Sequence, residues 1–444
     1  MEQKAVADSL AAVAARAVEL ARHLGADQAE AGVSYEEGLS VTVRMGELES
    51  VERQRDRGLG ITVYRDARKG SASTTDFSAA SIEDTVRKAL SIGSFTAADE
   101  YAGLADAELM AGASPDLDLY FPSEPDVERA TAIALRAENA ARALDARIAN
   151  SEGASVSGGA GHRVYANTHG FIGGYPTSTY STSCSVVAKS NGSLERDYWY
   201  SVSRSPDDLE APEHVGEEAA RRAVARLDAR PLSTRKVPVL YPAELAKGLF
   251  GHLVAAIRGT AQYRRASFLL DAVGEQVLPS FIDIDEDPWI PRGLASAPFD
   301  ADGVATRPRR LVAGGVLQGY VLSSYSARRL GLPTTANAGG VHNLLVTPTA
   351  GTLADLIADC EQGFVVGELL GQGVNIVTGD YSRGAAGFWV ERGQIVYPVH
   401  EVTIAGNLAD LFRQIQAVGS DVDARGTVRC GAVRVDGLTL AGSG

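Results

Sequence analysis

Alternating apolar segments separated by glycine constrain the fold of this sequence more than any other feature. The segment LSVTVRMGELESVERQRDRGLGITVYRD (residues 39–66) carries apolar side chains at every second position in two stretches, and turns are expected near Gly46 and Gly58. A period of two places such side chains on one face of a strand. The alternating positions are Leu39, Val41 and Val43, then Leu59, Ile61 and Val63.

More strands are expected further along the chain. Residues 148–204 are rich in Ser, Thr, Tyr and Gly, which favours β-structure over helix. In the second half, apolar runs are interrupted by glycine turns, as in RRLVAGGVLQGYVL, GFVVGELLGQGVNIVTGD and GFWVERGQIVYPVHEVTIAG. These patterns predict a C-terminal half built mainly from strands.

Helices are predicted where apolar residues recur every three or four positions. Ser123 is expected to cap one of these helices, with Asp126 in its first turn. The predicted fold class is α+β, with a mixed α/β N-terminal domain over residues 1–232 and a β-dominated C-terminal domain over residues 233–444. The predicted helices cover residues 3–24, about 79–92, about 124–144, about 212–228 and the segment around His252.

The charge of the chain argues against a nucleic-acid partner. The formal net charge is -14 over 444 residues, and no basic stripe is present. No stretch approaches the roughly 20 apolar residues of a membrane span, and the N-terminus lacks a signal-like apolar segment. The three cysteines lie far apart and form no CxxC pair. We therefore expect a cytoplasmic protein with reduced thiols.

Local motifs identify no active site. None of the seven histidines lies in an HExxH motif, and the dipeptide His400-Glu401 occurs in strand-like sequence, where adjacent side chains point to opposite faces. A GxSxG nucleophile motif is absent as well. The glycine-rich stretch GDYSRGAAG lacks the strand and helix context of a phosphate loop. From these residues alone, the sequence describes an acidic α+β protein without a recognisable catalytic constellation.

Long strings in both halves resemble a known family. SFLLDAVGEQVLP, GGVLQGYVLSSYSARRLGLPTTANAGGVHNL and GDYSRGAAGFWVERGQIVYPVHEVTIAGNL are similar to the TldD/TldE peptidase family, in its TldE (PmbA) branch. LSVTVRMGELESVERQRDRGLGITVY and RKGSASTTDFS match the same branch. The resemblance implies a TldD/PmbA-like fold. It also implies a two-subunit zinc metallopeptidase that acts on peptides and unfolded proteins.

The resemblance places a degraded metal motif on the helix around residue 252. The TldD-type subunit carries HExxxH, and HLVAAI occupies that position here, so that His252 remains while Leu253 and Ile257 replace Glu and the second His. A register two residues earlier would place Phe250, Gly251 and Ala255 there instead. Neither register supplies a zinc site. The family's C-terminal cysteine ligand is not transferred to Cys430, because the spacing differs.

The resemblance therefore implies a TldE-type subunit without catalytic or metal-binding residues of its own. Zinc is expected in a TldD-type partner, with which this chain would form a heterodimer. For the chain alone, a homodimer is an alternative that the sequence does not decide. The polar loop PTTANAGGVHNL is a candidate substrate or interface loop. A purely structural role for this loop is an equally good interpretation. Its candidate residues are Thr334, Thr335, Asn337 and His342.

Two other functions stay open from the sequence. One is a stand-alone peptide-binding homodimer or scaffold, because a fold does not fix a function. The other is a metal-independent hydrolase that uses a Ser, Thr or Cys nucleophile, although no spacing pairs such a residue with a His and an acid.

Overall fold

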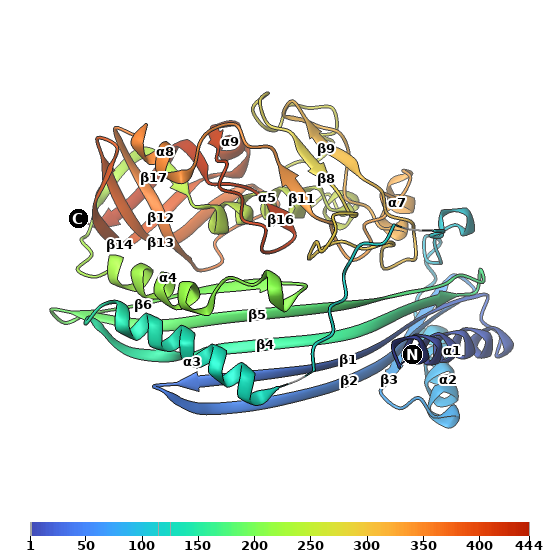
Figure 1. Cartoon of the computed structure of the whole chain (residues 1–444). Coiled ribbons are helices and arrows are strands. Elements are labelled where there is room, and N and C mark those ends of the chain that lie inside the picture. Colours follow the sequence, from blue (N-terminus) through green and yellow to red (C-terminus); the bar gives the residue numbers. More distant parts are fainter. Residues whose placement is uncertain (1, 114, 125, 444) are drawn as a thin grey trace.

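A long curved sheet and a β-rich C-terminal half make up the molecule (Figure 1). The structure, a computed structural model, describes residues 2–113, 115–124 and 126–443. Its helices and strands occur together in both halves, so the predicted α+β class is confirmed. In Figure 1 the C-terminal half lies along the β6 edge of the long sheet.

The long sheet has six antiparallel strands in the order β3-β2-β1-β4-β5-β6. Four of them contain 17 to 20 residues, and β1 pairs along nearly its whole length with both β2 and β4. The strands are β1 (Gln28–Arg44), β2 (Glu47–Arg65), β3 (Arg68–Thr74), β4 (Ile148–Asn167), β5 (Ile172–Ser190) and β6 (Ser193–Ser203).

Helices cover the two ends of one face of this sheet. α1 and α2 pack on the end that contains Val33 and Ile61, whereas α3 and α4 pack on the end that contains Val43 and Val186. Between the two helix pairs is a cavity of about 860 Å3, lined by Tyr35 among others. The helices are α1 (Glu2–His23), α2 (Ala79–Phe95), α3 (Val127–Leu144) and α4 (Pro212–Ala225).

Two local predictions are wrong. No turn occurs at Gly58, because β2 continues through it and Gly58 lies opposite Ser34 in the ladder. Ser123 does not cap α3. Asp126 is the cap, and its side chain accepts a hydrogen bond of 2.9 Å from the backbone N–H of Arg129. A carboxylate at this position also interacts favourably with the helix dipole.

Close contact between α3 and α4 depends on one glycine. A Cβ atom at Gly216 would lie 1.9 Å from the backbone oxygen of Ala137. We expect Gly216→Ala to lower the free energy of unfolding by about 2 kcal/mol, because a backbone carbonyl cannot move aside as a side chain can. Urea unfolding followed by circular dichroism measures this effect.

Gly248→Ala is the matched control for that measurement. Gly248 also lies inside a helix, but a Cβ atom there would meet nothing within 4 Å. Alanine at such a site is expected to raise the free energy of unfolding by about 0.5–1 kcal/mol. Equal effects of the two substitutions would contradict the expected clash at Gly216.

The C-terminal half contains two sheets around one large core. The first has the order β14-β13-β12-β7-β17-β15, and a further pairing of β14 with β17 curls it towards closure. Its strands are β7 (Ser233–Tyr241), β12 (Gln362–Leu370), β13 (Asp380–Glu391), β14 (Gln394–Asn407), β15 (Ile415–Val418) and β17 (Val433–Ser443). The second sheet has the order β10-β9-β8-β11-β16. Its strands are β8 (Ile284–Glu286), β9 (Arg309–Ala313), β10 (Val316–Leu317), β11 (Leu344–Val346) and β16 (Val428–Arg429).

Helix α5 runs through the core of this half and contacts β7, β12 and β16. The helices here are α5 (Ala243–Ile257), α6 (Gly259–Tyr263), α7 (Ser324–Leu330), α8 (Leu353–Ala358) and α9 (Leu408–Arg413). Within the described ranges, none of the helices combines the length and hydropathy needed to cross a membrane.

Candidate functional site

The HLVAAI segment forms the last part of α5. His252 is half-buried, and its ring meets the ring of Tyr381 edge-on at a centroid distance of 6.1 Å. Burial lowers the pKa of His252, and the positive charge of Arg383 lowers it further. Leu253 and Ile257, by contrast, are 1% and 0% exposed and contribute to the apolar core. Both side chains are part of the packing that holds α5 in the core.

The alternative register gives the same chemical result. Phe250 is completely buried, Gly251 is exposed and Ala255 is half-buried. None of these three side chains contains a metal-ligating atom. Across the residues that the structure describes, no three His, Cys, Asp or Glu side chains come together as a metal site would require.

Cys430 is buried below the start of α5, where its Sγ lies 3.9 Å from the carbonyl oxygen of Ala243. Burial raises the pKa of its thiol to about 12. Burial also raises the pKa of Cys184 to about 12 and the pKa of Cys360. A nucleophile or metal ligand must be a thiolate, so none of the three thiols has the environment of a reactive cysteine.

The candidate loop at residues 333–344 folds back onto the C-terminal half. Asn337 is 5% exposed, donates to Glu286 at 2.7 Å and accepts from Arg309 at 3.0 Å and from Thr335 at 2.7 Å. The Thr334 hydroxyl donates to the carbonyl oxygen of Leu322.

His342 lies at the other end of the loop. Its ring nitrogens lie 3.2 Å and 3.3 Å from the carbonyl oxygens of Ala336 and Ala295. The structure therefore brings Thr335 and Asn337 into one hydrogen-bond network. His342 joins this network through its backbone N–H, which donates to Glu286. These contacts fix the loop's conformation, and its role towards a substrate or partner stays a prediction.

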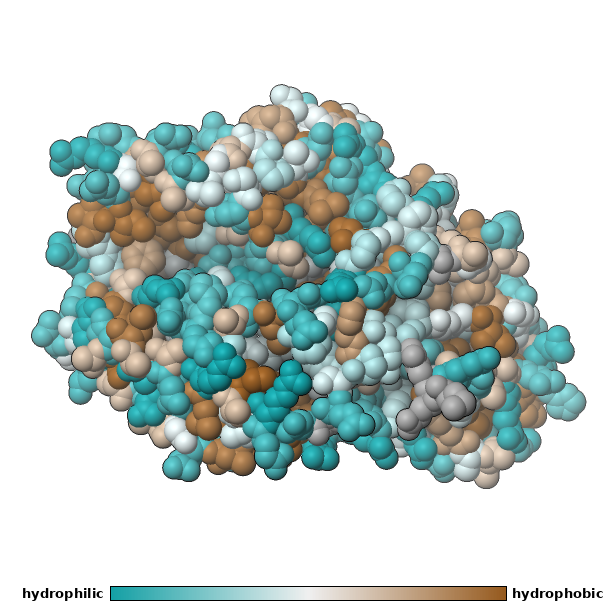
Figure 2. Space-filling view, viewed as in Figure 1, coloured by the Kyte–Doolittle hydropathy of each residue, from teal (hydrophilic) through white to brown (hydrophobic). Residues whose placement is uncertain are grey.

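A cleft between the two halves was not predicted from the sequence. It has a volume of about 960 Å3. One wall, from the C-terminal half, is apolar and includes Ile395 and Val396, which are 49% and 52% exposed. The opposite wall is the charged side of α4. Figure 2 shows hydrophobic residues gathered on the C-terminal half above a mostly hydrophilic lower half.

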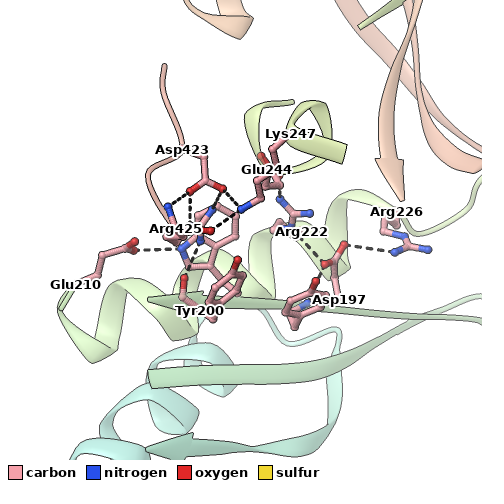
Figure 3. A network of polar contacts seen from close by, with 11 residues as sticks. Asp197, Tyr200, Glu210, Arg222, Arg226, Glu244, Lys247, Asp423 and Arg425 are labelled. Carbon is pink, nitrogen blue, oxygen red and sulfur yellow. Dashed lines mark hydrogen bonds and ion pairs between the residues drawn. The ribbon is translucent and has the colours of Figure 1, made fainter. Parts of the chain in front are cut away.

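Ion pairs join the two halves at the bottom of this cleft (Figure 3). Asp197 on β6 is 6% exposed and lies 3.2 Å from Arg222 of α4 and 3.4 Å from Arg226, the C-cap residue of α4. Arg222 also reaches Glu244 of α5 at 2.6 Å, and Arg226 reaches Glu368 of β12 at 2.5 Å. Burial lowers the pKa of each guanidinium, but the neighbouring carboxylates raise it by more. The pKa of both arginines therefore lies above its ordinary value.

A second group of charges lies beside the first in Figure 3. Asp423 pairs with Lys247 at 2.8 Å and with Arg425 at 2.9 Å. The guanidinium of Arg425 lies over the rings of Trp199 and Tyr200, at 4.0 Å and 4.6 Å from their centroids. Burial raises the pKa of Asp423, but the hydrogen bonds from Arg425 and Lys247 lower it by more, so that it lies below its ordinary value. These contacts fix the C-terminal half against β6.

A buried carboxylate lies at another contact between the halves. Asp300 is 4% exposed and accepts backbone hydrogen bonds from Asp302, Val304 and Ala338 at 2.9–3.0 Å. Val304 in turn pairs with Met110 of the N-terminal half. Burial and the neighbouring charge of Asp302 raise the pKa of Asp300 to about 7 in spite of these hydrogen bonds.

Comparison with known proteins agrees with this architecture. Family models described as PmbA/TldA metallopeptidase domain 1, central domain and C-terminal domain match residues 29–93, 120–227 and 234–442. The metalloprotease PmbA of Escherichia coli O157:H7 is 49% identical over 416 residues, which covers 94% of this chain and 92% of that relative. The chain belongs to the PmbA/TldD metallopeptidase family. The resemblance stated from the sequence is thereby confirmed.

Two solved structures have the same fold as this chain. A putative modulator of DNA gyrase from Bacteroides thetaiotaomicron superposes with a TM-score of 0.92 at 26% identity, and the match covers 97% of this chain and 98% of that one. TldE from Thermococcus kodakarensis gives a TM-score of 0.82 at 20% identity, over 96% and 99% of the two chains. The second likeness concerns the fold alone.

Proposed function

We propose that this chain is the TldE-type subunit of a two-subunit, cytoplasmic peptidase, and that it contributes no catalytic metal itself. In this proposal the zinc belongs to a TldD-type partner subunit, and the substrates are peptides and unfolded proteins. The observation that carries the proposal is the geometry of α5. In the family-derived register that begins at His252, the Glu and second His positions hold Leu253 and Ile257, whose side chains are core residues.

The chemistry of α5 supports this assignment. A catalytic zinc needs three protein ligands and a nearby carboxylate that activates the bound water. His252 is a single imidazole, and its ring packs against Tyr381. Leu253 can neither polarise water nor take up a proton. Restoring one ligand would therefore not restore a site.

The test compares this chain alone, a TldD-type chain alone and the two co-expressed. Zinc per chain and hydrolysis of an unfolded peptide are measured in each sample. We expect a stable complex with one zinc per pair. We also expect activity that falls by less than twofold on His252→Ala in this chain.

Other results would overturn the proposal. Zinc or hydrolysis in this chain alone would show a working site, and inhibition by a covalent Ser, Thr or Cys reagent would identify the metal-independent hydrolase. Peptide binding by this chain, together with no association with the TldD-type chain, would identify the scaffold.

A further inference from the structure

The turn between β5 and β6 contains the one Asn-Gly dipeptide of the chain, Asn191-Gly192. Ser190 and Ser193 pair as the last rung of the β5–β6 ladder, so the turn has only two residues. Both have a positive φ, 47° at Asn191 and 89° at Gly192. Such angles are typical of a tight hairpin turn, and asparagine and glycine are the residues that tolerate them. Both residues are exposed.

An asparagine followed by glycine can lose its side-chain amide without an enzyme. The backbone nitrogen of the glycine gives up its proton to hydroxide and attacks Cγ of the asparagine. The new N–Cγ bond closes a five-membered imide ring, the Cγ–Nδ2 bond breaks, and ammonia leaves after taking a proton from water. Water then opens the ring at either carbonyl carbon, which yields aspartate or isoaspartate. Glycine favours the attack because it has no side chain to shield the nitrogen.

Both reacting groups are free at Asn191. In the part of the chain that the structure describes, neither the backbone N–H of Gly192 nor the side chain of Asn191 forms a hydrogen bond. A Cβ atom at Gly192 would meet nothing within 4 Å. Water and hydroxide therefore have open access to the attacking nitrogen.

The other asparagines are shielded or held in place. Three are at most 5% exposed, namely Asn167, Asn337 and Asn343. Three more accept a backbone hydrogen bond through the side-chain oxygen, namely Asn150, Asn375 and Asn407. Asn139 lies inside α3, where the helix bonds occupy the backbone N–H groups. The structure thus singles out Asn191.

The turn has to open before the ring can close. The imide ring fixes the ψ angle of the asparagine far from the left-handed region that Asn191 occupies. The end of a hairpin opens at a lower free-energy cost than its middle. One contact opposes this opening, because the Ser190 hydroxyl donates to Oδ2 of Asp228 at 3.1 Å and ties the last rung to the loop after α4.

We infer that Asn191 is a site of spontaneous deamidation, and that the contact between Ser190 and Asp228 sets its rate by limiting how often the turn opens. The product gains a negative charge next to Ser190. The isoaspartate form also lengthens the main chain by one carbon atom. A two-residue turn fixes the register of its strands, so this form is expected to lose the rung between Ser190 and Ser193.

Peptide mapping of the full chain tests the inference. The chain is kept at pH 8 and about 37 °C, either folded or unfolded in urea, and then digested with trypsin. Residues 190–196 form one tryptic peptide, and deamidation raises its mass by about 1 Da. In the folded chain we expect Asn191 to react at least tenfold faster than any other asparagine.

Two serine variants test the role of the contact. Ser190→Ala removes the hydrogen bond to Asp228 and should raise the rate in the folded chain about threefold to tenfold, since such a bond contributes about 0.5–1.5 kcal/mol. The rate in urea should stay the same. Ser185→Ala is the matched control on the same strand. It removes a hydrogen bond of 2.9 Å to Glu152 away from the turn, and it should change the rate by less than twofold.

Three results would each overturn part of the inference. An unchanged peptide in the folded chain, over a time in which the unfolded chain reacts completely, would show that the turn protects Asn191. A faster reaction at another asparagine would overturn the choice of site. Equal rates for the folded parent chain and the folded Ser190→Ala variant would overturn the role of the contact with Asp228.

Discussion

Asp197→Ala should lower the free energy of unfolding by about 3 kcal/mol. Asp197 is 6% exposed and pairs with Arg222 and Arg226, both of which are themselves largely buried. Removing one partner of a buried ion pair leaves the other charge without compensation, which typically costs about 3–5 kcal/mol. We expect a value at the low end, because Arg222 keeps Glu244 and Arg226 keeps Glu368.

Urea unfolding followed by circular dichroism and by tryptophan fluorescence measures this change. Trp199 lies at the cleft and contacts Arg425, whereas Trp289 and Trp389 belong to the C-terminal half. The fluorescence therefore reports on the C-terminal half and its contact with β6. We expect the two signals to coincide in the parent chain and to separate in the variant, because the halves then unfold less cooperatively. Glu152→Ala is the control. Glu152 pairs with Arg196 at 3.3 Å on the surface, where such a pair contributes at most about 1 kcal/mol. An Asp197 variant as stable as the control would contradict the prediction.

The second large effect is a loss of stability as the pH rises. The pKa of Asp300 is about 7 in the folded chain, against an ordinary value of 3.8 for an exposed aspartate. Between these values the folded chain holds a proton that the unfolded chain has released, so the free energy of unfolding falls as the pH rises. From pH 5 to pH 8 we expect a decrease of about 2.5 kcal/mol from this residue. Glu30, whose pKa is also raised chiefly by burial, acts in the same direction.

Asp300→Asn separates this titration from other pH effects. Asparagine cannot ionise, but its single side-chain oxygen cannot replace both carboxylate oxygens. If it accepts from Asp302 and Val304, its NH2 group faces the backbone N–H of Ala338, and that hydrogen bond is lost. The variant is therefore expected to be less stable at pH 5, with a smaller decrease between pH 5 and pH 8. Urea unfolding at four pH values provides both numbers. A pH dependence identical to that of the parent chain would exclude Asp300 as its source.

Local patterns predicted which helices and strands are present better than they predicted the residues at which these begin and end. Alternation from Leu39 to Val43 identified β1 because the period of a strand is visible within five residues. Gly58 was misjudged because a glycine inside a long strand resembles a glycine in a turn. Ser123 was misjudged because Ser and Asp are both good helix caps, and three residues separate it from Asp126. The domain boundary near residue 232 stays a prediction.

The cleft could not be predicted because its residues come from distant parts of the sequence. Arg226 is 29 residues from Asp197 and 142 residues from Glu368. Their charges look like ordinary surface charges in the sequence, since no spacing rule connects them. The degraded motif on α5, by contrast, was located from the sequence through the family resemblance. Only the structure shows that Leu253 and Ile257 are buried in the core.

The pairing of β1 with β4 has a consequence for synthesis of the chain. Glu30 and Asn167 are partners in this ladder, although 137 residues separate them. At roughly 5–20 residues per second, a ribosome needs about 7–27 s to make the intervening segment. The hairpin of β1 and β2 can close within microseconds, and its apolar face around Val33 then lacks its second strand until β4 emerges. A nascent hairpin of this kind is a natural target for chaperones, and its completion by β4 is expected to limit the folding rate.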